Sequence, residues 1–129
     1  MSLDAVLENI PHVKWPEQDG KYKVVQFLID GRPYMRFGEK KHTSIVANFA
    51  PEIRAEIRVD TSGVSPIYFF MDENIYKIVG MGWCQLRGEI ADFYGTSTDY
   101  QMGIDERYLE TIKQISPDRA IFYDPDRIR

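Results

Sequence analysis

An Asp-Gly pair between two apolar runs is the strongest local signal in the chain. Residues 22–29 form the first run, residues 32–37 form the second, and Asp30 and Gly31 lie between them. Both central residues of a type I′ turn have positive φ angles, which glycine adopts freely and aspartate adopts more readily than most residues. The pattern therefore predicts a β-hairpin. Because Pro33 has no N–H to donate, we expect the second strand at an edge of its sheet.

Further apolar segments with turn signals at their ends predict more strands. These segments are residues 43–48, 75–86, 90–94 and 120–123. Gly80 and Gly82 interrupt the longest of them, which indicates a bulge or a close approach of another part of the backbone. Residues 66–71 are also apolar, but their pattern does not separate strand from helix.

Two segments favour helices. The clearer one covers residues 105–116, where Asp105 is a favourable N-cap residue ahead of apolar positions at helical spacing. The other is predicted to begin near Pro51, a residue suited to the first helical position, and to cover residues 52–59. Residues 55–60 also alternate between apolar and polar, as a strand would, so both structures stay open for that segment.

These elements predict a single α+β domain over residues 1–129. We expect one mixed β-sheet of about six strands with two main helices packed on it. The 129 residues suffice for one hydrophobic core, and 43% apolar with 28% charged residues is typical of a folded chain. Residues 1–3 have the appearance of a cloning remnant, and residues 124–129 are expected to form a frayed tail.

Charge and cysteine content narrow the choice of partners. The chain has 16 basic and 20 acidic residues, well mixed, for a net charge of −4. This balance argues against duplex nucleic acid as a partner, since such binders carry a basic face. No apolar run approaches the ~20 residues of a membrane span, so we expect no membrane contact. The single Cys84 cannot form an internal disulfide and lies in an apolar run, which favours a buried thiol and a cytoplasmic location.

The two histidines do not indicate a metal site. His12 and His42 are far apart in the sequence, and neither has a cysteine or histidine at ligand spacing. We therefore expect neither a metal ion nor a cofactor. His42 follows two lysines in a charged connector, and a solvated loop is its expected environment. The alternative for His42 is the role of a catalytic base.

Residues 90–108 combine a strand, a loop of small polar residues and a helix. The loop consists of Gly95, Thr96, Ser97 and Thr98. Such a loop between a strand and a helix can present several backbone N–H groups and hydroxyls at one point, which suits an anion. An ordinary polar turn is the alternative for this loop.

Four blocks of the chain resemble the Janus/Ocnus family of phosphohistidine-phosphatase-like proteins. The blocks are residues 10–13 with 20–25, residues 44–46, residues 54–57 with 62–63, and residues 90–117. The resemblance implies a mixed sheet with packed helices and a phosphate site at the strand-to-helix loop. Residues 66–74 look like an insertion relative to the family.

The resemblance also implies roles for individual residues. Lys23 matches the family's lysine on the first strand, and Ser97, with Thr96 and Thr98 beside it, matches the loop serine that helps to hold the phosphoryl group. Arg87 matches a basic residue of the site less closely. Where the family has its catalytic histidine, this chain has Arg54. Arginine stays protonated near pH 7 and cannot act as a general base, but it can bind phosphate.

The sequence thus favours a Janus-like protein that binds a phosphorylated small molecule or phosphoprotein, or another anion, at the loop of residues 95–98. Phosphatase activity is doubtful without the usual histidine, unless His42 replaces it. The alternative is a protein-interaction or structural module, which a homodimer would suit. Its working surface would be the hairpin edge and the aromatic residues Trp15, Tyr34 and Tyr100.

Overall fold

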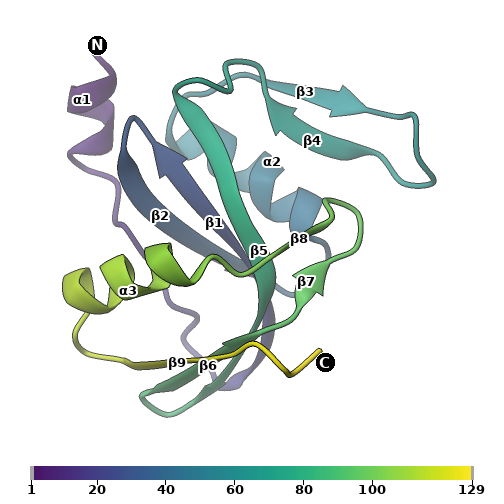
Figure 1. The fold of residues 1–129 in the computed structure, drawn as a ribbon. Coiled ribbons are helices and arrows are strands. Elements are labelled where there is room, and N and C mark those ends of the chain that lie inside the picture. Colours follow the sequence, from purple (N-terminus) through teal and green to yellow (C-terminus); the bar gives the residue numbers. More distant parts are fainter. Residues whose placement is uncertain (1, 129) are drawn as a thin grey trace.

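Five strands form the central sheet of the computed structural model, which describes residues 2–128 (Figure 1). The strand order across the sheet is β2-β1-β5-β6-β9. Neighbouring strands are antiparallel except β6 and β9, which are parallel. The strands are β1 (Gly20–Ile29), β2 (Arg32–Gly38), β5 (Tyr76–Arg87), β6 (Ile90–Tyr94) and β9 (Ala120–Asp124). The α+β class is confirmed, with five strands in the main sheet where about six were expected.

The predicted hairpin is confirmed. β1 and β2 pair in antiparallel register around Asp30 and Gly31, whose φ angles are 49° and 78°. Pro33 lies in β2, which is an edge strand of the sheet, as its missing N–H predicts.

The prediction of a bulge or a close approach at the two glycines of β5 is confirmed. The pairing of β1 with β5 shifts between Gln26 and Phe27, so that Val79 is an extra residue opposite them, which is a β-bulge. A Cβ atom at Gly80 would lie 2.0 Å from Oε1 of Gln26, and one at Gly82 would lie 2.6 Å from the carbonyl oxygen of Tyr94. Any larger residue would therefore push these segments apart.

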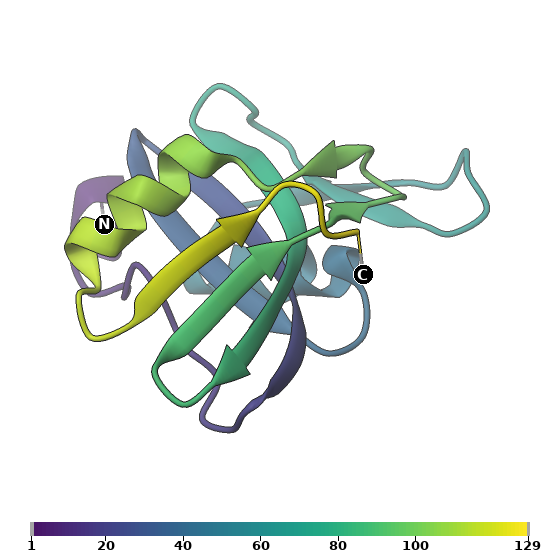
Figure 2. The same cartoon turned by 60° about the horizontal axis from the view of Figure 1, so that its bottom comes forward.

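The two longer helices cover opposite faces of the sheet (Figures 1 and 2). α2 (His42–Glu52) packs over the half of one face that carries the odd-numbered core residues of β1, such as Val25 and Phe27. α3 (Glu106–Ile115) packs on the other face, where the buried Cys84 lies. Burial raises the pKa of the Cys84 thiol, in agreement with the predicted inert side chain.

The prediction of a strand at residues 43–48 is wrong, because α2 occupies this segment. The β-branched residues there have a strand-like local preference, but tertiary packing decides between the two structures. Ile45, Val46, Phe49 and Ala50 are buried, at helical spacing, against the sheet. Strand pairing would have placed half of these side chains on the wrong face.

The helix predicted for residues 52–59 is also wrong. Pro51 lies inside the last turn of α2 rather than at a helix start, and the chain then forms β3 (Ile57–Asp60). β3 pairs with β4 (Ile67–Phe70), and this hairpin lies next to α2 (Figure 1). The strand alternative for residues 55–60 is therefore correct, and the apolar segment of undetermined type is a strand.

The C-terminal part of the chain makes specific hydrogen bonds. Asp105 caps α3 by accepting a hydrogen bond from the N–H of Arg107, as predicted. A frayed tail was expected from residue 124 onward, and the described part of it makes specific contacts: β9 includes Asp124, and the Arg127 side chain bonds Gln85 while its carbonyl accepts the N–H of Gly95. The remaining short elements are α1 (Leu3–Leu7), β7 (Thr96–Ser97) and β8 (Met102–Gly103).

Candidate functional site

A pocket of about 490 Å³ lies where the uncovered part of the sheet meets the start of α2 and the loop after β6. We call it the lysine pocket, because three lysines from two segments line it. The structure brings Lys23 and the loop residues Thr96, Ser97 and Thr98 together here, as the resemblance implied. The complete lining also includes Lys21, Lys41, His42, Trp83, Asp99 and Ile128.

The lysines reach the pocket for reasons of strand and helix geometry. Lys21 and Lys23 are two residues apart on β1 and so lie on the same face of the sheet. Lys41 immediately precedes α2. Within residues 2–128, none of the three ammonium groups has a carboxylate within ion-pair distance, and Asp99 is the only carboxylate in the lining. The pocket therefore carries excess positive charge in a protein whose net charge is negative.

The aromatic ring of Trp83 lines the pocket beside these lysines. It pairs with Lys23 across β1 and β5, and the ammonium groups of Lys21 and Lys23 lie 5.5 and 5.2 Å from its ring centroid. Lys21 also lies over Tyr94, whose ring contacts the Arg127 guanidinium at 3.8 Å. Cation–π contacts of this kind hold the lysine side chains over the sheet without neutralising their charge.

The N-terminus of α2 adds hydrogen-bond donors to the same place. Lys41 is the N-cap residue, no side chain caps the helix, and the first turn contains no acidic residue. The first N–H groups of a helix have no partner within the helix, and together with the helix dipole they favour an anion. Lys41 and His42 both line the lysine pocket, so this uncapped end borders it.

The segment after β6, predicted as a loop, contains the two-residue strand β7 and is held in shape by Gly95 and Ser97. Gly95 has a φ of 76°, and a Cβ atom there would lie 2.7 Å from Cδ1 of Trp83. Ser97 is buried, and its hydroxyl accepts a hydrogen bond from the N–H of Tyr100. Thr96 and Thr98 are exposed on either side of it. Ser97 therefore shapes the turn, while the two threonine hydroxyls are open to a ligand.

His42 is buried in the pocket wall, which corrects the expectation of a solvated loop. Its ring nitrogen Nε2 lies 2.8 Å from the carbonyl oxygen of Gly82, which can only accept, so Nε2 carries the proton. Burial, together with the nearby Lys23 ammonium, lowers the pKa of His42 below its usual 6.5 despite the opposing effects of the Gly82 bond and Asp99. The neutral ring therefore keeps a lone pair on Nδ1 near pH 7.

Two of the predicted ligand residues lie elsewhere. Arg54 follows the C-terminal end of α2 and is exposed, while the lysine pocket lies at the opposite end of this 11-residue helix, about 15 Å away at 1.5 Å per residue. Arg87 is the last residue of β5 and forms an ion pair with Asp92. Neither residue lines the lysine pocket.

The aromatic surface of the interaction alternative does not form as predicted. Tyr34 and Tyr100 are buried, and Trp15 is half-buried against Phe37. Among residues 2–128 no group of histidine, cysteine and acidic side chains is arranged to hold a metal ion. The same part of the chain contains no helix long and apolar enough to cross a membrane.

Sequence analysis identified Lys23, the loop threonines and Ser97, but it missed three other parts of the pocket. Lys21 could have been found from its two-residue spacing to Lys23. Lys41 could have been found only with α2 correctly placed, and Trp83 only with the register of β1 and β5. Models of known protein families give no match to this chain, and a search of curated proteins finds no significant relative.

Proposed function

We propose that this protein binds a phosphorylated ligand in the lysine pocket. One observation carries the proposal: three lysines that have no carboxylate partner within residues 2–128, two threonine hydroxyls and an uncapped helix N-terminus all border the same pocket. Phosphoryl groups need several converging donors and positive charge, and these groups supply both. The resemblance to the Janus/Ocnus family supports the same choice of ligand through Lys23 and the loop.

The size of the pocket favours a ligand larger than inorganic phosphate. A volume of about 490 Å³ lies within the range of small-molecule sites, roughly 300–1,000 Å³. The phosphoryl group would lie near Lys23, Lys41 and the start of α2, and the rest of the ligand would extend over Trp83, along the part of this sheet face that α2 does not cover. A phosphorylated residue of a peptide has both parts: a phosphoryl group and a further portion that would lie over Trp83.

The test is an NMR titration of the ¹⁵N-labelled protein with phosphoserine and with inorganic phosphate at constant ionic strength. We expect saturable shifts for the amides of Lys41, His42 and residues 96–98. Lys23→Gln should weaken binding by about tenfold, since a charge-assisted hydrogen bond is worth roughly 1.5–3 kcal/mol. Lys113→Gln, which removes a charge from the opposite face on α3, is the matched control. Shifts confined to other residues, or an unchanged affinity in Lys23→Gln, would refute the proposal.

Hydrolysis of the bound phosphoryl group is a second candidate, and His42 is the observation that favours it. The neutral ring with a lone pair on Nδ1 could take a proton from water as its oxygen bonds to phosphorus, and the bond from phosphorus to the leaving group would break. This role would be supported if the protein released phosphate from p-nitrophenyl phosphate and the rate fell by about 10²–10⁴-fold in His42→Asn. An equal rate in His42→Asn would exclude it and leave the binding proposal intact.

A further inference from the structure

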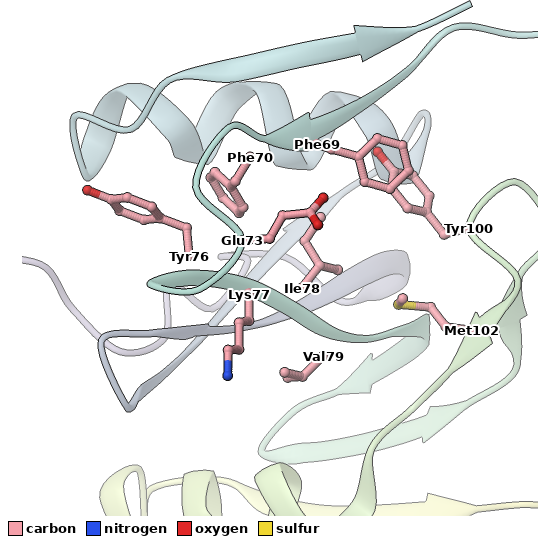
Figure 3. Close-up of a pocket in the computed structure, with 9 residues that line it drawn as sticks. All are labelled: Phe69, Phe70, Glu73, Tyr76, Lys77, Ile78, Val79, Tyr100 and Met102. Carbon is pink, nitrogen blue, oxygen red and sulfur yellow. The ribbon is translucent and has the colours of Figure 1, made fainter. Parts of the chain in front are cut away.

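A second pocket, of about 310 Å³, lies between the β3–β4 hairpin, β5 and the segment after β7 (Figure 3). We call it the aromatic pocket. Two pairs of rings form its sides: Phe69 with Tyr100, at 5.3 Å between centroids, and Phe70 with Tyr76, at 5.6 Å. Ile78 and Met102 complete the apolar lining. None of the predicted ligand-binding residues lines this pocket, although Tyr100, named for the interaction alternative, does.

Glu73 is the charged group that faces the aromatic pocket. Figure 3 shows its carboxylate pointing across the opening toward Phe69, whereas the side chains of Lys77 and Val79 leave β5 on the other side. Arg58, which is ion-paired with Glu73, and Lys77, which also lines the pocket, offset this negative charge, so Glu73 acts here as a hydrogen-bond acceptor rather than as a source of net charge. Faces of aromatic rings also carry negative potential, so the rings and the carboxylate favour the same sign of ligand charge.

The protein's own Arg58 shows which cation this edge of the pocket accepts. Its guanidinium lies 4.7 Å from the centroid of the Phe69 ring, and its Nη2 donates to Oε1 of Glu73 at 3.0 Å. Both side chains of this ion pair are largely exposed, so the pair alone contributes little stability. Within the described residues the second oxygen, Oε2, has no hydrogen-bond partner, and it remains able to accept one.

We propose that the aromatic pocket binds an arginine side chain of a partner protein. The guanidinium would stack on the rings that line the opening and donate to Oε2 of Glu73, while its methylene groups would contact Ile78 and Met102. A planar guanidinium suits both contacts better than a lysine ammonium, because it stacks on rings and presents donors in a fixed plane. A pocket of about 310 Å³ is at the lower end of the range for small ligands, which fits one side chain.

The inference does not depend on the lysine pocket. The two pockets share no lining residue, and their expected ligands have opposite charge. The lysine pocket can fail to bind phosphate while the aromatic pocket binds arginine, and the reverse also holds.

The experiment compares two short peptides, Gly-Arg-Gly and Gly-citrulline-Gly, with blocked termini. Citrulline has nearly the shape of arginine but no charge, so the pair isolates the contribution of the cation. In NMR titrations we expect the arginine peptide to shift the amides of Phe69, Glu73 and Met102 and to bind at least about fivefold more tightly, as cation–π and carboxylate contacts predict. Equal affinities, or shifts outside the pocket, would overturn the proposal.

Variants test the two named contacts. Glu73→Gln should reduce the affinity for the arginine peptide about fivefold or more, while Asp72→Asn, which removes the same charge from the neighbouring residue, should change it little. Arg58→Gln frees the Phe69 ring and Oε1 of Glu73, so it should tighten binding. Weaker binding to Arg58→Gln, or an equal loss in Glu73→Gln and Asp72→Asn, would refute the assignment. Circular dichroism confirms that each variant is folded.

Discussion

At the scale of single residues, two glycines with nearly the same backbone conformation differ in their surroundings. Gly31 has a φ of 78° and open space where a Cβ atom would be. Gly95 has a φ of 76°, but its Cβ would meet Trp83 at 2.7 Å and the carbonyl oxygen of Ile128 at 3.0 Å. Comparing them separates backbone strain from packing.

We expect Gly31→Ala to lower the free energy of unfolding by about 1–2 kcal/mol, the cost of a left-handed backbone for an L-residue. Gly95→Ala should cost a further ~1–3 kcal/mol, because overpacking adds to the same strain. Urea unfolding measures both. An equal loss of unfolding free energy in the two variants would mean that Trp83 moves away from the new Cβ atom at no energetic cost. Phosphate binding should weaken in Gly95→Ala alone, since only this residue shapes the loop of the lysine pocket.

His42 should make stability depend on pH. Its pKa in the folded protein is lowered, first by burial and then by Lys23, while the Gly82 bond and Asp99 act in the opposite direction. The unfolded chain therefore binds the proton more readily. The stabilising effect is fully present above pH 6.5 and declines as the pH falls below this value toward the pKa of the folded state.

The prediction is a free energy of unfolding that decreases between about pH 6.5 and 5 in the native protein and decreases less in His42→Asn. Asparagine can still donate to the Gly82 carbonyl, so the comparison preserves the hydrogen bond. Denaturant unfolding at several pH values gives the slopes. Identical slopes in the two proteins would show that His42 protonates equally easily in the folded and unfolded states.

At the scale of elements, the start of α2 combines a structural weakness with the proposed function. A helix without an N-cap side chain leaves N–H groups unsatisfied, and a serine at that position typically adds about 1 kcal/mol of stability. The same hydroxyl would occupy the donors that a phosphoryl group needs.

Lys41→Ser should therefore raise the free energy of unfolding by about 0.5–1 kcal/mol and weaken phosphate binding. Lys41→Ala removes the lysine without adding a cap, so it serves as the control and should bind phosphate more tightly than Lys41→Ser. Calorimetry measures both quantities. If Lys41→Ser and Lys41→Ala bind phosphate equally, the helix N-terminus takes no part in binding.

Elements with strong local signals were predictable from the sequence. The Asp30–Gly31 hairpin follows from φ preferences, and α3 follows from its cap and its apolar spacing, because neither depends on distant residues. α2 was not predicted, since its β-branched residues favour a strand locally and only packing on the sheet selects the helix. The apolar spacing of Ile45, Val46 and Phe49 was the signal that could have found it.

Only those parts of the candidate site that depend on a single segment of the chain were predictable. The loop at residues 95–98 and Lys23 follow from the sequence and the resemblance, but their meeting with Lys41 and Trp83 depends on strand register and on the position of α2. Arg54 was placed in the site because it stands where the Janus/Ocnus family, which the chain resembles, has its catalytic histidine. The chain in fact turns there at the far end of α2, where the φ of Arg54 is 54°.

At the scale of the whole molecule, Tyr100 joins parts that are distant in the sequence. Its buried hydroxyl donates to the carbonyl oxygen of Tyr68 at 2.6 Å and lies 3.1 Å from Oγ1 of Thr43 on α2. Burial, as the main cause, raises the pKa of Tyr100, so the phenol stays protonated and able to donate. The hydrogen bonds of the Tyr100 hydroxyl thus link the segment after β7 to the β3–β4 hairpin and to α2.

Tyr100→Phe should lower the free energy of unfolding by about 1–3 kcal/mol, since it leaves the Tyr68 carbonyl without this donor. Hydrogen exchange should accelerate most at the amides of β3 and β4. Tyr108→Phe on α3 is the control, because within residues 2–128 the Tyr108 hydroxyl makes no hydrogen bond. Uniform acceleration of exchange over the whole sheet would show that the Tyr100 hydrogen bonds do not stabilise the β3–β4 hairpin in particular.

The segment from Thr96 to Met102 has a further consequence, because its beginning borders the lysine pocket and its end borders the aromatic pocket. Any ligand that displaces this short stretch changes the shape of both walls. Thermodynamic reciprocity then requires that each ligand alter the affinity for the other by the same factor. A partner that carries both a phosphate and an arginine would experience this cooperativity directly, and separate titrations with either group alone would misstate how tightly it is held.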